Sequence, residues 1–361
     1  MNRIRVLIIE DSRVVREFLE HIISRDPRLE VVGSAASAEE GIRLLPRVRP
    51  DVISLDIRLP GMNGFEATRQ IMSQRPTPIV VVSASVEAED LNITMNALKA
   101  GALTVVEKPV GTTHEDYEAL AQRLCTQLAV MSQVAVIRQR FNRPRPDRHG
   151  VNGAAPPWPR FSPGRSDRPF QMLGMVASTG GPRALQQILS NLPADYPLPI
   201  ALVQHISDCF HEGFVRWLAN SCALKVMVAQ HLQHLKPGHV YVAPPDHHLT
   251  VTNRGFVLNR EELVCLERPS GTVLLNSIAD CYGGDAIGVV LTGMGNDGAA
   301  GLAKLHQAGG YTIAEDESTA VINGMPAAAV QLHAVRESLP LECISPRLME
   351  LGLSTERVVT P

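Results

Sequence analysis

Short runs of β-branched and other apolar residues recur along this chain, and segments of helical length separate them. The first part of the chain holds five such runs: IRVLIIE, LEVVGSA, PDVISLD, TPIVVVSA and ALTVVEKP. Runs that are apolar along their whole length, rather than at every second position, are typical of strands buried on both faces of a sheet. The pattern therefore predicts a parallel sheet with helices on both of its faces.

The same alternation resumes later in the chain, where the expected strands are FQMLGMVAS, PIALVQH, KVMVAQ, GHVYVAP, AIGVVLTG and GYTIAED. The segment HHLTVTNRGFVLN instead alternates around Asn253, Arg254 and Gly255, and it predicts a β-hairpin added to the second sheet. A chain of 361 residues, 45% of them hydrophobic, is long enough for two domains with substantial cores. We expect two doubly wound parallel-sheet α/β domains.

The composition changes abruptly between Arg138 and Arg168, where the chain holds eight arginines, six prolines and two aspartates without a helical or strand period. Such a segment is typical of a flexible linker. We therefore expect a first domain over residues 1–125, a linker over residues 126–168 and a second domain over residues 169–355.

Charge and cysteine usage narrow the class of protein. The net charge is −3, so nothing in the overall balance favours binding to nucleic acid or to a membrane surface. The amino terminus lacks a leader-like apolar run, and no later segment is apolar for long enough to insert into a membrane. Six cysteines without a CxxC pair suit a reducing compartment. We expect a cytoplasmic protein.

Polar residues follow four of the strands in the first domain: Glu10 and Asp11, Asp56, Ser83, and Lys108. Because the carboxyl ends of parallel strands converge on one crevice, we expect these side chains to meet there. Clustered carboxylates repel one another unless a cation joins them, and hard oxygen ligands favour Mg²⁺. With the hydroxyl and the ammonium group, they would form a site for a phosphoryl group. Alternatively, Asp11 and Ser12 only cap the first helix, and Lys108 is a solvated lysine.

Together with the motif LPGMNG after Asp56, these strand ends make residues 1 to about 125 resemble a two-component receiver domain. The resemblance implies a flavodoxin-like fold, phosphorylation of Asp56 by a histidine kinase, and Mg²⁺ as the cofactor of that reaction. It assigns Glu10, Asp11 and Asp56 as metal ligands and Ser83 with Lys108 as the switch pair. The chain departs from the family pattern in two places: the acidic pair is Glu-Asp rather than Asp-Asp, and Val105 replaces the usual aromatic residue of the switch.

The stretch GMVASTGGPRAL leaves two roles open for Ser178. A serine shortly before Pro182 is typical of a helix N-cap, since Pro suits the first turn of a helix. Ser178 also ends a strand, as does His205, and Asp297 follows the strand in AIGVVLTGMGN. A hydroxyl, an imidazole and a carboxylate that converge in one crevice form the set that a Ser-His-Asp hydrolase needs. The chain order Ser, His, Asp excludes the nucleophile elbow of α/β-hydrolases.

The motifs ASTGGP, QH, LTGMGNDG and AEDESTAVINGMP resemble the catalytic domain of the chemotaxis protein-glutamate methylesterases. The resemblance implies a Rossmann-like domain with Ser178 as nucleophile, His205 as base and Asp297 as the residue that orients the base. It also implies that the Met294 N–H binds the oxyanion and that Thr179 assists His205. The activity so implied is hydrolysis of glutamyl methyl esters on chemoreceptors, and deamidation of glutamines there, without a cofactor for the ester reaction. The unphosphorylated receiver would cover the catalytic crevice.

Two other function classes compete with this enzyme. A response regulator whose second domain binds a phosphate or nucleotide through STGGP would use the same glycine turn at a helix start. That binding module has no need of a general base with an orienting carboxylate, so His205 and Asp297 favour the enzyme. A transcription factor would need a basic recognition helix, which the sequence lacks. The loop ISDCFHEGF after His205 departs from the usual family sequence and leaves substrate preference open.

Overall fold

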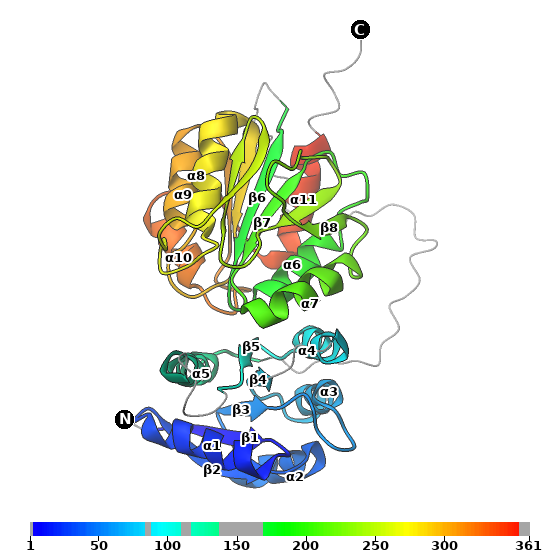
Figure 1. Ribbon diagram of the computed structural model, residues 1–361, viewed down its shortest axis with the longest axis vertical. Helices are drawn as coiled ribbons and strands as arrows, with labels where there is room; N and C mark the ends of the chain where they lie inside the picture. The colour runs from blue at the N-terminus through cyan, green and yellow to red at the C-terminus, as the bar shows by residue number, and fades with distance from the viewer. Residues whose placement is uncertain (1–2, 84–87, 110–116, 137–168, 354–361) are drawn as a thin grey trace. The chain divides into compact units, whose positions relative to one another are not determined.

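The computed structural model describes residues 3–83, 88–109, 117–136 and 169–353, which form two compact units (Figure 1). Most of the expected linker, residues 137–168, lies outside the described residues. Helix α5 (Tyr117–Met131) continues past residue 125, because Leu128, Ala129 and Met131 are buried. The domain boundaries in the sequence analysis stay a prediction.

The first unit is a five-stranded parallel sheet with the order β2-β1-β3-β4-β5, which is the order of flavodoxin-like folds. Helices α1 and α5 lie on one face of the sheet and α2, α3 and α4 on the other (Figure 1). The strands are β1 (Ile4–Ile9), β2 (Leu29–Ala35), β3 (Val52–Leu55), β4 (Ile79–Ser83) and β5 (Thr104–Glu107). The helices before α5 are α1 (Arg13–Arg25), α2 (Ala38–Val48), α3 (Gly64–Gln74) and α4 (Ala88–Ala100).

Three of these helices begin where the sequence supplies a capping side chain. Ser12, Ser37 and Asn63 each accept a hydrogen bond from the main-chain N–H three residues further on. Such a cap satisfies one of the N–H groups that a helix start leaves without a partner. The helix starts, and with them the lengths of the loops at the carboxyl edge of the sheet, thus follow from local sequence.

The second unit holds a seven-stranded parallel sheet with the order β14-β13-β12-β6-β7-β9-β8. Its strands are β6 (Met172–Ala177), β7 (Ile200–Gln204), β8 (Lys225–Val228), β9 (His239–Val242), β12 (Ala286–Val290), β13 (Tyr311–Glu315) and β14 (Glu337–Leu339). The chain starts in the middle of the sheet at β6 and builds outward in both directions, so this sheet too is doubly wound. Both predicted parallel sheets are confirmed.

Helices cover both faces of this sheet (Figure 1). Helix α8 packs against α9, and α9 against α10, on one side, while α6 packs against α11 on the other. These helices are α6 (Gly181–Leu189), α8 (Gly271–Tyr282), α9 (Ala299–Gln307), α10 (Gly324–Gln331) and α11 (Leu341–Leu353), with a short 3₁₀ turn at Gly283–Asp285. Helix α7 (Asp208–Ala219) follows β7 in the chain, and most of it groups with the first unit, which includes Ile206–Trp217. Among the described residues, no helix combines the length and the apolar character needed to cross a bilayer.

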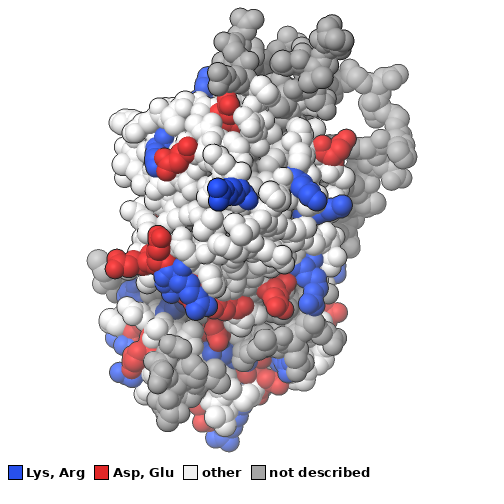
Figure 2. Space-filling view, turned by 45° about the horizontal axis from the view of Figure 1, so that its top comes forward, with Lys and Arg blue, Asp and Glu red and all other residues white. Residues whose placement is uncertain are grey.

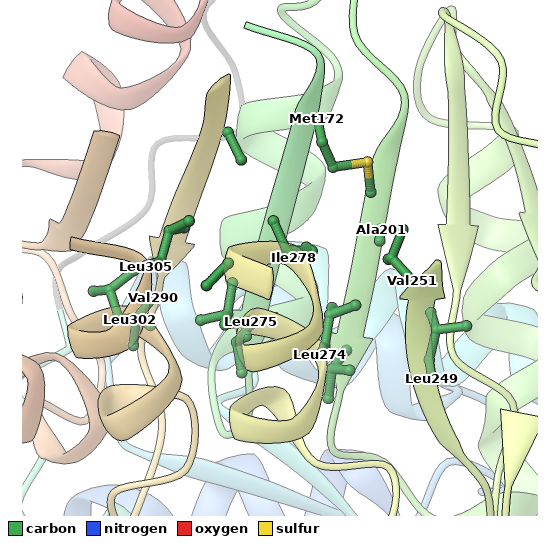
Figure 3. Close-up of a cluster of buried hydrophobic side chains, with 14 of the residues drawn as sticks. Met172, Ala201, Leu249, Val251, Leu274, Leu275, Ile278, Val290, Leu302 and Leu305 are labelled. Carbon is green, nitrogen blue, oxygen red and sulfur yellow. The ribbon is translucent and has the colours of Figure 1, made fainter. Parts of the chain in front are cut away.

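The expected hairpin is present, but it does not join the second sheet. Strands β10 (His248–Thr252) and β11 (Gly255–Asn259) pair with each other as a separate two-stranded sheet. The reason is that its apolar side chains pack on a helix instead: β10 lies against α8, and Leu249 and Val251 belong to the hydrophobic core between α8 and the large sheet (Figure 3). Strand β14 was not among the predicted strands; it is short and partly exposed.

Both sheets have a point where the winding direction reverses. In the first unit it lies between β1 and β3, and in the second between β6 and β12. The loops that follow two such neighbouring strands leave toward opposite faces, so a crevice opens at the carboxyl ends of the strands, and ligands of doubly wound folds bind there. The residues that end these four strands are therefore the first candidates for functional sites.

Candidate functional sites

The first unit brings its predicted site residues together at the end of β1, β3 and β5. The Lys108 ammonium lies 2.8 Å from Glu10 Oε2 and 2.9 Å from Asp56 Oδ2, and both carboxylates are almost fully buried. Glu10, Asp11 and Asp56 each offer one carboxylate oxygen, and these three oxygens lie within 4.8 Å of one another. The three carboxylates thus fit a divalent cation of the size and hardness of Mg²⁺.

Burial dominates the electrostatics of this cluster. It raises the pKa of Glu10, and the Asp56 charge raises that pKa further, although Lys108 acts in the opposite direction. Burial likewise raises the pKa of Asp56, and Lys108 offsets part of the increase. Burial lowers the pKa of Lys108, but the two carboxylates outweigh it and the pKa is raised. Lys108 therefore stays a cation, and additional positive charge would stabilise the ionised forms of the two carboxylates.

The remaining predicted receiver residues lie at the same edge. Ser83 is buried at the end of β4, and its carbonyl accepts a hydrogen bond from the Lys108 N–H at 3.0 Å. Ser12 caps helix α1, whereas Asp11 belongs to the carboxylate cluster. Val105 pairs with Val81 across β4 and β5 and is half-buried. Its short aliphatic side chain carries no ring that could rotate as an aromatic switch residue would.

In the second unit, Ser178 follows β6 and is not the cap of helix α6. The N-cap is Gly180, whose φ of 81° lies in the left-handed region that favours glycine, and Pro182 occupies the first turn. The main chain of Ser178 is held from three sides: its N–H donates to Thr292, and its carbonyl accepts from the Gly181 N–H and the Gln204 side chain. Of the two roles that the sequence left open, the structure thus removes the helix cap.

His205 and Asp297 form a close pair. His205 Nε2 lies 2.9 Å from Asp297 Oδ2, and both side chains are buried. His205 follows β7, and its N–H donates to the carbonyl of Ala177 at the end of β6, so the histidine lies beside the strand that leads to Ser178. The second ring nitrogen, Nδ1, is 3.8 Å from Glu267 Oε1, which is beyond hydrogen-bonding distance.

The Asp297 carboxylate is fixed by the start of helix α8. It accepts hydrogen bonds from Ser270 Oγ at 2.7 Å, from the Gly271 N–H at 2.6 Å and from the Thr272 N–H at 3.0 Å. Burial by itself raises the pKa of Asp297, but the hydrogen bonds and charge of His205, with those of Ser270 and Thr272, outweigh it and hold the pKa well below its ordinary range. Asp297 is therefore ionised and keeps a proton on His205 Nε2.

The turn that follows β12 approaches Ser178 closely, and glycine makes this possible. A Cβ atom on Gly293 would lie 2.7 Å from the Ser178 Cβ and 2.1 Å from Met325 Sδ. Met294 comes next, with an exposed side chain, and within the described chain its main-chain N–H has no hydrogen-bond partner. A free N–H group beside a strand-end serine can bind a developing oxyanion. The carbonyl of Thr179 accepts a hydrogen bond from Thr292 Oγ1 at 2.9 Å, so the main chain of Thr179 is held by the same residue as Ser178. The role of Thr179 as an assistant of His205 stays a prediction.

The sequence motifs did not indicate the polar side chains that hold these residues in place. The buried Gln204 amide donates to the carbonyls of Ser178 and His205, at 2.9 and 2.8 Å. Ser270 and Thr272 orient Asp297, and Glu267 lies near His205. The segment PSGT at residues 269–272 has the composition of a helix start, which is the one local signal that could have indicated an anion-binding position.

The two units define a class of protein with two doubly wound domains. The first holds a cluster of carboxylates and a lysine of the receiver type, and the second holds Ser178 and the His205–Asp297 pair at the carboxyl ends of its strands. Residues 173–348 match the family model for CheB methylesterase, and residues 6–117 match that for response regulator receiver domain. The chain belongs to the CheB methylesterase family, with an amino-terminal receiver domain.

Curated relatives match over nearly the whole chain. The "Protein-glutamate methylesterase/protein-glutamine glutaminase 2" of Paramagnetospirillum magneticum is 54% identical, over 98% of this chain and 99% of that protein. The "Protein-glutamate methylesterase/protein-glutamine glutaminase" of Nitrosospira multiformis is 44% identical, over 96% of this chain and 97% of that protein. A solved structure, the CheB methylesterase catalytic domain of Thermotoga maritima, is 36% identical over 50% of this chain and 98% of that one, with a TM-score of 0.49. The family predicted from the sequence motifs is confirmed.

Proposed function

We propose that this protein is a phosphorylation-activated protein-glutamate methylesterase, which hydrolyses glutamyl methyl esters on chemoreceptors. The observation that carries the proposal is the buried pair of His205 and Asp297, whose carboxylate is fixed by three further donors, at the switch point beside Ser178. A domain that only binds phosphate or nucleotide would have no use for an oriented imidazole. Family membership supports the same activity, because the curated relatives carry it in their names.

The acylation step follows from the tautomer of His205. Because Nε2–H donates to Asp297, Nδ1 is the nitrogen that takes the proton of Ser178 as its Oγ attacks the ester carbonyl carbon. The carbonyl oxygen becomes an oxyanion, which the Met294 N–H stabilises. When the intermediate collapses, the bond to the methoxy oxygen breaks, the His205 proton passes to that oxygen, and methanol leaves.

Deacylation repeats these events with water. His205 takes a proton from the water as its oxygen attacks the acyl-enzyme, and it returns the proton to Ser178 Oγ when that bond breaks, so the product is a glutamate side chain. The same steps on a glutamine side chain release ammonia in place of methanol, so we include glutamine deamidation in the proposal. All bonds are made and broken by groups of this chain and water, so the ester reaction needs no cofactor.

The carboxylate cluster of the first unit is the proposed control site. Asp56 accepts a phosphoryl group from a histidine kinase, and Glu10, Asp11 and Asp56 would hold Mg²⁺. When bound, the cation supplies the positive charge that lets a phosphoryl dianion approach three carboxylates. Lys108, which already contacts Asp56, neutralises a further phosphoryl oxygen, and Ser83 lies at the adjacent strand end. Phosphorylation then releases the restraint that the receiver places on the esterase.

Location and partners complete the proposal. We place the protein in the cytoplasm, with a chemoreceptor as substrate and without membrane insertion. Binding of nucleic acid is not part of the proposed function. On the face seen in Figure 2, the described Lys and Arg side chains of the second unit are interspersed with Asp and Glu and do not form a continuous basic stripe.

Release of methanol from methylated receptor membranes tests the proposal most directly. Ser178→Ala should lower the rate by ~10⁶, since removing a triad nucleophile leaves only the oxyanion site and substrate binding. Thermal unfolding should be nearly unchanged, because Ser178 is held by its main chain. A variant that keeps a substantial fraction of wild-type turnover would show that Ser178 is not the nucleophile.

A further inference from the structure

Glu315 is a buried acidic residue beneath the turn that follows β12. It is the last residue of β13 and is only 1% exposed. Its Oε2 accepts a hydrogen bond from the Thr292 N–H at 2.9 Å, and its Oε1 accepts one from Thr319 Oγ1 at 3.1 Å. The proposed reaction steps make no use of this carboxyl group. Burying a carboxyl group costs free energy, and here the two hydrogen bonds compensate for that cost.

Thr292 connects Glu315 to the catalytic main chain. The carbonyl of Thr292 accepts from the Ser178 N–H at 3.0 Å, and its Oγ1 donates to the carbonyl of Thr179 at 2.9 Å. Two residues further along the chain is Met294, whose N–H is the proposed oxyanion donor. A shift of Thr292 would therefore displace the nucleophile and the oxyanion donor together, and small displacements in a catalytic site cause large losses of rate.

We propose that Glu315 is a positioning residue of the esterase site: by accepting the Thr292 N–H, its carboxyl group holds the main chain of Ser178 and the 292–298 turn in their catalytic arrangement. This inference rests on the proposed function, because it takes Ser178 as the nucleophile. Without Glu315 the buried Thr292 N–H would lose its acceptor, and a buried donor without a partner is among the costliest defects in a protein interior.

The protonation of Glu315 provides a second test of this role. Burial raises its pKa to about 7, the hydrogen bonds from Thr292 and Thr319 oppose this, and the charges of Asp316 and of Glu342 on α11 add to it. Ionisation places a negative charge under the turn that must hold an oxyanion, and like charges repel strongly where water is excluded. We therefore expect the wild-type rate to decline as the pH rises above about 7.

Three substitutions in the full-length, phosphodonor-treated protein separate positioning from general stability. Glu315→Leu removes the acceptor and should lower kcat for methanol release by ~10-fold or more with little change in KM. Glu315→Gln keeps an acceptor for Thr292, so it should retain most of kcat and lose the alkaline decline, because an amide does not ionise. Glu317→Gln makes the same chemical change at an exposed position and should behave as wild type.

The outcomes distinguish this inference from the proposed function. Absence of any Ser178-dependent methanol release in the wild type would overturn both. An active wild type in which folded Glu315→Leu keeps full kcat, or in which Leu and Gln lose kcat equally, would overturn the positioning role alone. Should Glu315→Leu fail to fold by circular dichroism, the pH profile of Glu315→Gln decides: a profile identical to that of wild type refutes the role of Glu315.

Discussion

At the residue scale, Asp297 combines two tasks that usually fall to separate side chains. Its carboxylate closes the start of helix α8 through Gly271 and Thr272, and it also accepts from His205. The positive end of a helix stabilises a carboxylate, so the helix keeps Asp297 ionised although it is buried. The charge that selects the His205 tautomer is therefore maintained by the fold.

Whereas the pKa of Asp297 is lowered, that of Glu315 is raised, and the raised pKa predicts that stability depends on pH. Its pKa is about 7 in the folded chain against an ordinary value of 4.5, so the folded state holds the proton to higher pH. The contribution of Glu315 to stability is then greatest at a pH below 4.5, the pKa in the unfolded chain. It falls as the pH rises from 4.5 to about 7 and does not change further at higher pH. At about 1.4 kcal/mol per pH unit, the full loss is about 3 kcal/mol.

Glu315→Gln should remove this pH dependence. Urea unfolding of the full chain at several pH values, followed for the second unit, measures the difference in unfolding free energy between the variant and wild type. That difference should shift in favour of the variant as the pH rises, while Glu317→Gln should show no such shift. A difference for Glu315→Gln that stays constant between about pH 5 and about pH 8 would contradict the raised pKa.

At the scale of elements, the site depends on how closely the turn after β12 approaches β6. These strands pair in parallel from Met172 to Val176, and the Ser178 N–H continues the ladder by donating to Thr292. The next residue, Gly293, leaves no room for a side chain against Ser178. The spacing between Ser178 and the turn after β12 is thus set by the absence of a Cβ atom at Gly293.

Gly293→Ala should therefore damage catalysis and stability together. The added methyl group must displace Ser178 or Met325, and overpacking of this kind typically costs about 1–3 kcal/mol. Methanol release and thermal unfolding measure the two effects. Gly284→Ala is a matched control in the same unit, because a Cβ there meets its nearest atoms at 3.6 Å, an ordinary contact distance. Equal behaviour of the two variants would show that the turn has room to move.

At the scale of the whole molecule, the chain uses one architectural device twice. Each unit is a doubly wound sheet, and in each the candidate site lies where the winding reverses, with carboxylates and Lys108 in the first unit and Ser178, His205 and Asp297 in the second. The chemistry differs because different side chains end the strands, while the geometry that gathers them is the same. Regulation then requires that phosphorylation of the first site alters the rate at the second.

Asp56→Asn in the full-length protein tests this coupling. A small phosphodonor with Mg²⁺ should raise methanol release by wild type and leave Asp56→Asn at its basal rate, since an amide cannot accept the phosphoryl group. A ~10-fold activation would correspond to about 1.4 kcal/mol of coupling between the sites. Labelling with a radioactive phosphodonor provides the second measurement. Equal labelling of Asp56→Asn and wild type would place the phosphoryl group elsewhere.

The sequence by itself determined the two sheets and the residue types at their edges. Apolar runs and turn residues act over a few positions, so strands such as Ile4–Ile9 and Met172–Ala177, and the polar residues that follow them, could be predicted locally. The motifs also identified the family, which the relatives confirm. The catalytic roles of Ser178, His205 and Asp297 remain predictions that the observed geometry supports.

Only the tertiary structure decided which strands are neighbours, and with them the contacts that complete the site. Placing β12 beside β6 brings Thr292 against Ser178, and placing β13 beside β12 brings Glu315 under Thr292. The hairpin formed its own sheet because α8 offered its apolar residues a surface to pack on. Such contacts join residues far apart in the chain, and their free energy depends on burial and on partners that exist only after folding. A local sequence pattern therefore cannot predict them.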